Sequence, residues 1–449
     1  MTPVQQQAVV PAQRQPSAPA TRRLLGRTTG RLRESTRTAP GRLRLAGAVL
    51  TGLLLLLGAA TCWQAVGLGR ATDQVVSHSE PLSENAAEIY RSLADADTTA
   101  AGNFLLAGNA PAAVHQRYQD DLAKAGRLLT EAAARTDTSS AAQGSIAKLN
   151  QQLPVYSALV ATAGTYDRQG LPLGGAYLRH ASELMRTTML PTAQQLVDDE
   201  RKRLDADYED ALGLPYLAAG LGVLTLAALV WCQVLLLRRT NRVFNIGMLG
   251  ATAAVVLTLG WLATAGAAAQ SGLGDSRDHA ARPLRALDQA RFSALQARAA
   301  ENLDLVARGA TTQYTTDWAA DTKALSGGQL DQARQGAPEG SVQALTAART
   351  AFQNWTAKHQ AAATANDAGD YDTALKAVIG PGSDSSDAAF AALDQHLADA
   401  ATVEQAAFRS AARGVGGWWT ALAGGAVVLA ALGAAGVVVG LGRRLAEYR

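Results

Sequence analysis

Few residues in this 449-residue chain have the types and spacing that catalysis or metal binding requires. Its six histidines form neither a HExxH pair nor a cysteine–histidine ligand set, and no Walker-type loop or dinucleotide-binding glycine motif occurs. The two cysteines, Cys62 and Cys232, cannot build a disulfide framework. We therefore expect a protein that is not an enzyme and that has no metal site and no cofactor.

The remaining polar residues suit binding better than catalysis. Asn103 and Asn302 each interrupt an apolar helical seam, where a lone asparagine either sets the helix register or contacts a ligand. Candidate partner-docking residues fall in expected turns: Asn109, Asp167, Arg168, Asn366, Asp367, Asp370 and Tyr371. Ordinary turn chemistry is the alternative explanation for each of them. Arg168, beside Asp167, is the best single candidate for a polar contact with a partner.

Four long windows without any charged residue separate the polar parts of the chain. They cover residues 45–69, 211–237, 243–274 and 414–442. A helix needs ~20 apolar residues to cross the hydrocarbon core of a bilayer, and each window is long enough. We predict transmembrane helices over residues 45–69, 214–237, 243–270 and 417–442.

The distribution of charge predicts the orientation of these helices. The net charge is only +3, but residues 1–44, 238–242 and 443–449 together hold 15 basic and two acidic residues. The positive-inside rule places these three segments in the cytoplasm of a bacterial cell, and the segments 70–213 and 271–416 outside it. The basic arm 1–44 is expected to be disordered. Candidate cytoplasmic contacts are Arg238, Arg239, Arg242, Arg443 and Arg444, whose alternative role is only to fix the topology.

The two outer segments predict a duplicated helical domain. Each is about 145 residues long and is flanked by two spans, and Pro81-Leu82 in the first parallels Pro283-Leu284 in the second. Apolar residues recur at steps of three and four, and glycine or proline clusters break each segment into four helices. In the first segment the third helix is expected over about residues 141–168 and stops at Gly170, and in the second the breaks are expected at Gly309, 336–338 and 366–369. The expected fold is an all-α membrane protein with four transmembrane helices and two tandem extracytoplasmic up-down four-helix bundles. The pair Gly436 and Gly440 suits helix packing within the chain or a homodimer.

Two stretches in the first outer segment carry a family resemblance: "ADADTTAAGNFLLAG" (94–108) and "YDRQGLPLGGAYLRHA" (166–181). Together with the topology, the duplication and the arginine-rich arm, they make the chain similar to the GlnX-type four-span membrane proteins of actinobacteria. The resemblance implies a link between an extracytoplasmic glutamate- and aspartate-binding lipoprotein, GlnH, and the cytoplasmic serine/threonine kinase PknG. Bundles on stalk helices also resemble the sensor domains of chemoreceptors and sensor kinases.

Signal relay is therefore the expected function. The chain would couple an outer amino-acid-binding protein, or an amino acid itself, to a separate cytoplasmic kinase, because only seven residues follow Gly442. The alternatives are a structural membrane scaffold and an accessory subunit of a transport complex. The low aromatic content, 5%, argues against a nucleic-acid binder that stacks bases.

Overall fold

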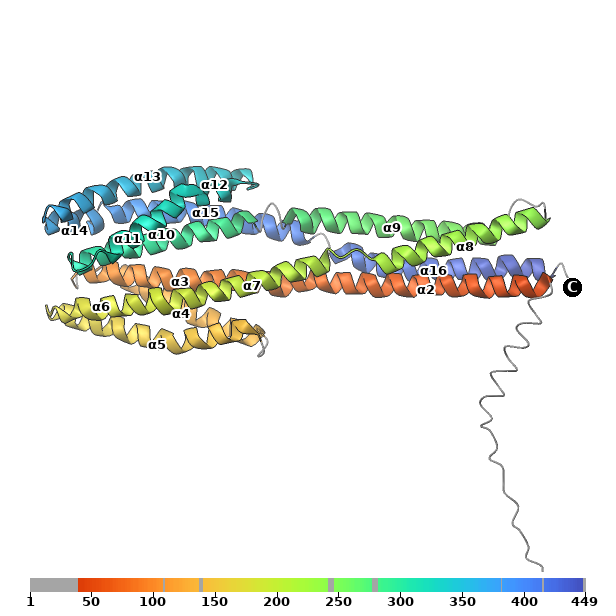
Figure 1. Cartoon of the computed structure of the whole chain (residues 1–449), viewed down its shortest axis with the longest axis horizontal. Coiled ribbons are helices and arrows are strands. Elements are labelled where there is room, and N and C mark those ends of the chain that lie inside the picture. Colours follow the sequence, from red (N-terminus) through yellow and green to blue (C-terminus); the bar gives the residue numbers. More distant parts are fainter. Residues whose placement is uncertain are drawn as a thin grey trace, which may run out of the picture. The chain divides into compact units, whose positions relative to one another are not determined.

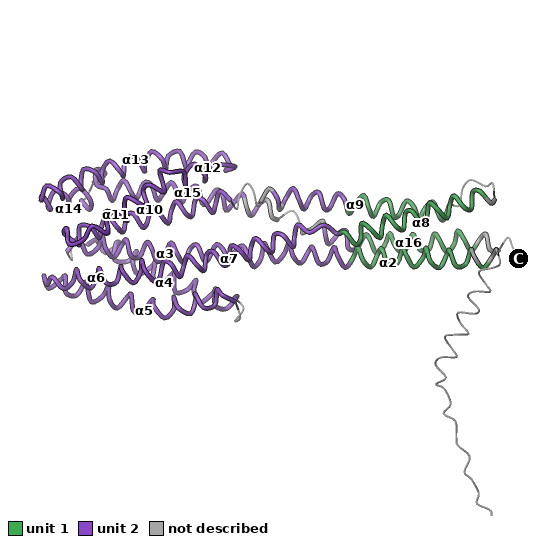
Figure 2. The backbone as a smooth tube through the Cα atoms, in the orientation of Figure 1, with its two compact units in different colours: residues 1–62, 216–262, 424–449 green, residues 63–215, 263–423 purple. Residues whose placement is uncertain are grey.

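The computed structural model describes residues 39–107, 110–136, 140–240, 246–276, 282–380, 382–413 and 416–446 (Figure 1). These residues form helices and turns, with no strand among them. They divide into two compact units, one made of residues 1–62, 216–262 and 424–449 and the other of residues 63–215 and 263–423 (Figure 2). The chain is thus the all-α membrane protein that the sequence predicts.

The first unit contains the apolar parts of four helices that are long and apolar enough to cross a membrane. These helices are α2 (Ala39–Gln74), α8 (Tyr216–Thr240), α9 (Ile246–Ser276) and α16 (Gly416–Ala446). A small apolar core includes Leu54, Val255 and Val437. Other large apolar side chains, such as Leu56, Trp231 and Leu432, are instead exposed on the surface of the helices. Apolar side chains on the outside of the helices suit a lipid environment. The backbone also suits it, because the polar groups along a helix are hydrogen-bonded to one another.

Helices α9 and α16 approach each other closely through glycines. A Cβ atom added to Gly247 would lie 2.2 Å from the carbonyl oxygen of Gly436 and 2.9 Å from the Cα atom of Gly440. The predicted glycine pair therefore packs within the chain, as small residues do between membrane helices. Nearby, Gln233 of α8 donates hydrogen bonds to Thr252 Oγ1 (2.8 Å) and to the carbonyl of Met248 (3.1 Å) on α9.

The second unit contains two helical bundles, of which the first has four antiparallel elements. They are α3 (Glu80–Leu105), α4 (Ala112–Arg135), α5 (Ala141–Arg168), and α6 (Leu173–Leu184) continued by α7 (Leu190–Ala211). A π-helical turn, Met185–Met189, joins α6 to α7, and another, Val75–Ser79, joins α2 to α3. The break that the sequence predicts at Gly170 is confirmed by a positive φ of 70° at that residue.

The second bundle follows the same plan with more interruptions. Its helices are α10 (Arg282–Ala307), α11 (Gln313–Ala324), α12 (Leu330–Arg334), α13 (Glu339–Asp367), α14 (Tyr371–Ile379) and α15 (Ser386–Arg413). Positive φ values at Gly309, Gly336 and Gly369 confirm the three breaks expected from the sequence. The expectation of only four helices was wrong in detail. Gly328, with φ 130°, kinks the chain between α11 and α12, and α14 ends at Ile379 before α15 begins at Ser386.

The two bundles pack together through α3 and α10. The rings of Tyr90 and Phe292 lie against each other with centroids 3.8 Å apart. Thr98 donates its hydroxyl to the carbonyl of Leu295 (3.2 Å), and Asn302 donates its side-chain amide to the carbonyl of Thr98 (3.2 Å). Within the described part of the chain, four ion pairs also cross between the bundles: Arg117–Asp394, Arg186–Asp317, Arg201–Asp288 and Arg285–Asp205. The duplicated halves therefore form one body, which the sequence could not decide.

The glycine contact in the membrane unit leads to a first prediction. Gly247→Ala should lower the thermal unfolding temperature of the full-length chain in detergent, because its methyl group would overlap the backbone of α16. Gly250→Ala is the matched control on the same helix, since a Cβ atom there meets nothing within 4 Å. Equal unfolding temperatures for the two variants would contradict the α9–α16 packing.

Candidate functional site

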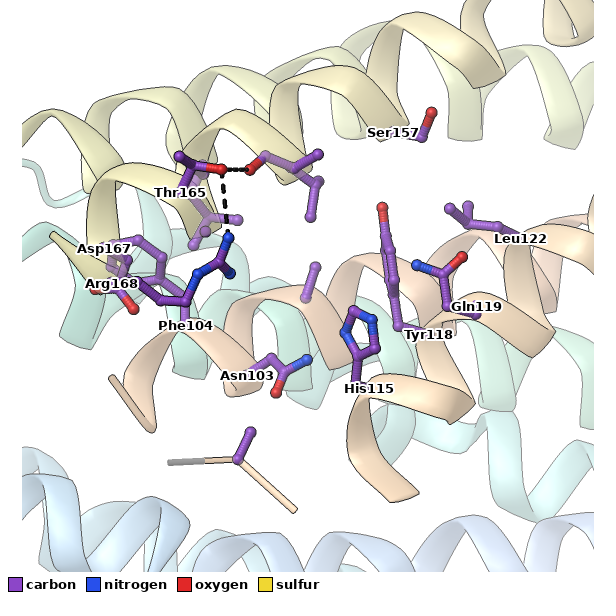
Figure 3. Close-up of a pocket in the computed structure, with 17 residues that line it drawn as sticks. Asn103, Phe104, His115, Tyr118, Gln119, Leu122, Ser157, Thr165, Asp167 and Arg168 are labelled. Carbon is purple, nitrogen blue, oxygen red and sulfur yellow. Dashed lines mark hydrogen bonds between the residues drawn. The ribbon is translucent and has the colours of Figure 1, made fainter. Parts of the chain in front are cut away.

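A cavity of about 600 Å³, open to solvent where His115, Gln119 and Arg168 are exposed, lies between α3, α4, α5 and α6 of the first bundle (Figure 3). Such a volume falls in the range of about 300–1,000 Å³ typical of small-molecule sites. Its walls are made of small, apolar and polar side chains from all four helices: Ala100, Asn103, Phe104, Ala110, His115, Tyr118, Gln119, Leu122, Ser157, Val160, Ala161, Ala163, Gly164, Thr165, Asp167, Arg168 and Leu178. Several of these residues are alanine or glycine, and their small volume leaves the space open.

Arg168 is the charged group that faces this space. In Figure 3 its guanidinium points towards Thr165, and Nη2 donates a long hydrogen bond of 3.4 Å to Thr165 Oγ1. The neighbouring Asp167 points its carboxylate away from the cavity. Burial raises the pKa of Asp167, and the positive charge of Arg168 partly offsets this rise. Arg168 thus brings a positive charge to one end of the cavity, and the carboxylate of Asp167 lies beside it but is turned away from this space.

A buried carboxylate lies one helical turn from the cavity wall, on the same face of α3. Asp97 is 1% exposed, and its Oδ1 accepts hydrogen bonds from Tyr156 (3.0 Å) and Ser182 (2.9 Å). Its other oxygen, Oδ2, has no partner. Burial raises the pKa of Asp97 to about 6, against the opposing effect of these hydroxyl donors and of Arg186. Asp97 therefore ties α3 to α5 and α6 behind the cavity.

The sequence-predicted docking residues separate into two groups. Asp167 and Arg168 line the cavity, together with Asn103, whereas Asn302 is buried in the α3–α10 contact. The candidates of the second bundle lie at the turn between α13 and α14: Asn366, Asp367, Asp370 and Tyr371. Asn109 lies outside the described residues.

The residues of the second turn perform ordinary structural roles. Asp370 caps α14 by accepting a 3.1 Å hydrogen bond from the Thr373 amide, and this bond lowers the pKa of Asp370. The guanidinium carbon of Arg308 lies 4.3 Å from the ring centroid of Tyr371. These contacts fit the alternative of turn chemistry, and a docking role for this turn stays a prediction.

The predicted cytoplasmic contacts lie at helix ends. Arg238, which is exposed, and Arg239 belong to the last turn of α8, while Arg443 and Arg444 belong to the last turn of α16. Arg242 lies outside the described residues. Nothing in the structure tests their contact with a partner.

Sequence reasoning missed a charged network in the core of the second bundle. Glu301 accepts hydrogen bonds from Ser386 (2.6 Å) and Trp355 (3.1 Å), and it pairs with Arg298 and with His359 Nδ1 (3.0 Å). Burial alone would raise the pKa of Glu301, but Arg298, His359 and Ser386 outweigh it and lower the value to about 2. The three-residue spacing of Arg298 and Glu301 on a helix was the available sequence signal.

Comparison with known proteins shows that the first bundle is similar to a sensor domain. Residues 71–209, which contain α3 to α7 except for the last two residues, match the family model described as an actinobacterial sensor domain. No curated protein and no solved structure matches the chain. The match supports a sensing or signalling role for this membrane protein, and the cavity lies within the matched residues.

The buried carboxylate leads to a second prediction. Because the pKa of Asp97 is raised from 3.8 to about 6, its contribution to stability is full below pH 4 and is lost as the pH rises through 6. The Asp97→Asn variant has no titrating group at this position, so it should not show this loss of stability. Its free energy of unfolding relative to wild type should therefore rise by about 2 kcal/mol between pH 4 and pH 7.

Unfolding of the full-length chain at both pH values, followed by circular dichroism, measures this difference. Asp120→Asn, at an exposed position on α4, is the control. A difference between Asp97→Asn and wild type that does not change with pH would contradict the assignment.

The charged network leads to a third prediction. Glu301→Gln leaves the buried Arg298 without its nearest negative charge and should cost about 3–5 kcal/mol of stability. Glu131→Gln breaks the exposed Glu131–Arg135 pair and should cost less than about 1 kcal/mol. Equal unfolding temperatures for the two variants would show that the network does not support the second bundle.

Proposed function

We propose that this chain is a non-enzymatic transmembrane signal-relay protein. In this proposal it resides in a bacterial plasma membrane with both termini in the cytoplasm and both bundles outside. It couples an extracytoplasmic amino-acid-binding protein, or an amino-acid ligand, to a cytoplasmic serine/threonine kinase. A link of the GlnH–PknG type is the specific form that the resemblance suggests.

The observation that carries the proposal is the place of the cavity. It lies within the residues that match a sensor domain, and α3 supplies both part of its wall and the contact with α10. Helix α3 also follows α2 through the π-helical turn Val75–Ser79 without a break in the helix. Membrane sensors of this kind transmit a signal by small displacements of helices.

A second observation supports docking of an outer protein beside the cavity. The turn between α5 and α6 exposes two leucines, Leu171 at 42% and Leu173 at 54%, next to Arg168. Exposed apolar side chains beside a charged residue are typical of protein interaction sites. This turn is the first-bundle tip at which the binding lipoprotein would dock.

The fourth prediction concerns the cytoplasmic partner. The full-length chain, purified from its native membranes, should bring down a serine/threonine kinase that mass spectrometry can identify. A variant whose residues 1–40 are scrambled should recover at least about fivefold less kinase, since it keeps the arginines that set the topology but loses any specific contact.

Each outcome of this experiment has a defined meaning. Absence of a kinase from the wild-type sample would overturn the relay. If the scrambled arm leaves the recovery of kinase unchanged, the contact is assigned to the helix ends. The double variant Arg443→Gln with Arg444→Gln then tests that assignment.

A further inference from the structure

We propose that the cavity of the first bundle binds a small monoanionic ligand with an apolar body, and that Arg168 holds its anionic head. This inference rests on the proposed sensing function and specifies the chemistry of the ligand. It adds a direct small-molecule site to a bundle whose expected partner is a protein.

The shape of the cavity suits a compact ligand with an apolar part. Phe104, Leu122, Val160 and Leu178 give it apolar surface from all four helices. Sites for small molecules are typically lined by such side chains, with a few polar groups that fix the orientation of the ligand. A single polar end on an otherwise apolar molecule matches this distribution.

The charge of the cavity favours an anion. Arg168 turns its guanidinium towards the cavity, and its Nη2 makes only the 3.4 Å bond to Thr165. Among the described residues Arg168 belongs to no ion pair, although the charge of Asp167 acts on it. An arginine with free donors can hold a carboxylate through two parallel hydrogen bonds.

A buried hydroxyl offers a second point of attachment. Tyr118 lines the cavity and is 6% exposed, and its hydroxyl has no hydrogen-bond partner in the structure. In Figure 3 its ring extends from α4 into the space between α4 and α5. Burial raises the pKa of Tyr118, so the group stays a hydrogen-bond donor. An unpaired buried hydroxyl is unfavourable, and a ligand acceptor that reached it would remove this cost.

Asp167 provides a test of the sign of the ligand charge. Its carboxylate acts on Arg168 from outside the cavity and weakens the positive potential there. Asp167→Asn should therefore strengthen the binding of an anion, whereas Arg168→Gln should weaken it. A residue with a merely structural role would not produce this opposite pair of effects.

The experiment uses three probes that share a phenyl body and differ in charge: phenylacetate, phenylacetamide and phenylethylammonium. Binding to the full-length chain in lipid nanodiscs is measured by saturation-transfer NMR, with empty nanodiscs as the blank. Phenylacetate should bind at least about tenfold more tightly than the neutral amide, and the cation most weakly. Arg168→Gln should abolish this preference, and Asp167→Asn should increase it several-fold.

Two further variants complete the design. Tyr118→Phe should weaken phenylacetate and phenylacetamide alike by about fivefold, since both present an acceptor. Arg127→Gln, an exposed position on α4 outside the cavity, should change nothing.

Preference for the amide or the cation, or no binding of phenylacetate, would overturn the proposed ligand class. The relay would still stand if the kinase co-purifies with the chain, because that experiment does not depend on the cavity. If no kinase co-purifies but the chain still binds the anion, the relay is overturned and the proposed ligand site stands.

Discussion

The contact between α3 and α10 joins the two helical bundles into one domain. Helix α3 buries more than one face: 15 of its 26 residues are buried, because α4 and α7 cover one side and α10 another. Polar groups at the contact are paired across it, from Asn302 to the Thr98 carbonyl and from Thr98 to the Leu295 carbonyl. Separating the bundles would break the bond of the buried Asn302 amide and expose apolar surface of both helices, whereas Thr98 would keep its 2.9 Å bond to the Ala94 carbonyl. The two halves are therefore constrained to act as one body.

Side-chain volume explains why the cavity belongs to the first half. Around it, alanines and Gly164 take positions on α3, on α5 and just before α4, so the helices meet without filling the space between them. The core of the second half holds Trp355, fully buried, with Phe352 and Phe390 packed edge-on against it. His359 stacks on Trp318 at 3.5 Å and also pairs with Glu301. The core of the second bundle is thus filled by aromatic side chains and held by polar contacts, and this bundle packs against the first.

Local patterns were sufficient to predict the helices and most of their ends. The third helix, expected over residues 141–168, is α5 with those bounds, because its apolar spacing and the glycine at 170 both act locally. The break between α14 and α15 was missed although Gly380, Pro381 and Gly382 are the glycine and proline signals that end helices. The site depended on tertiary packing. Asn103 and Asn302 have the same local setting in the sequence, yet one lines the cavity and the other seals the bundle contact.

The two faces of α3 give the cavity a physical route to the second bundle. Asp97, Ala100 and Asn103 are spaced by three residues and lie on the side of the cavity, while Thr98 lies on the side of α10. Close-packed interiors do not deform continuously, so a ligand that presses on one face of a helix displaces the helix as a whole. Any such displacement must strain the Thr98–Leu295 and Asn302–Thr98 bonds or carry α10 along. Helix α3 is thus the element through which occupancy of the cavity reaches the second bundle.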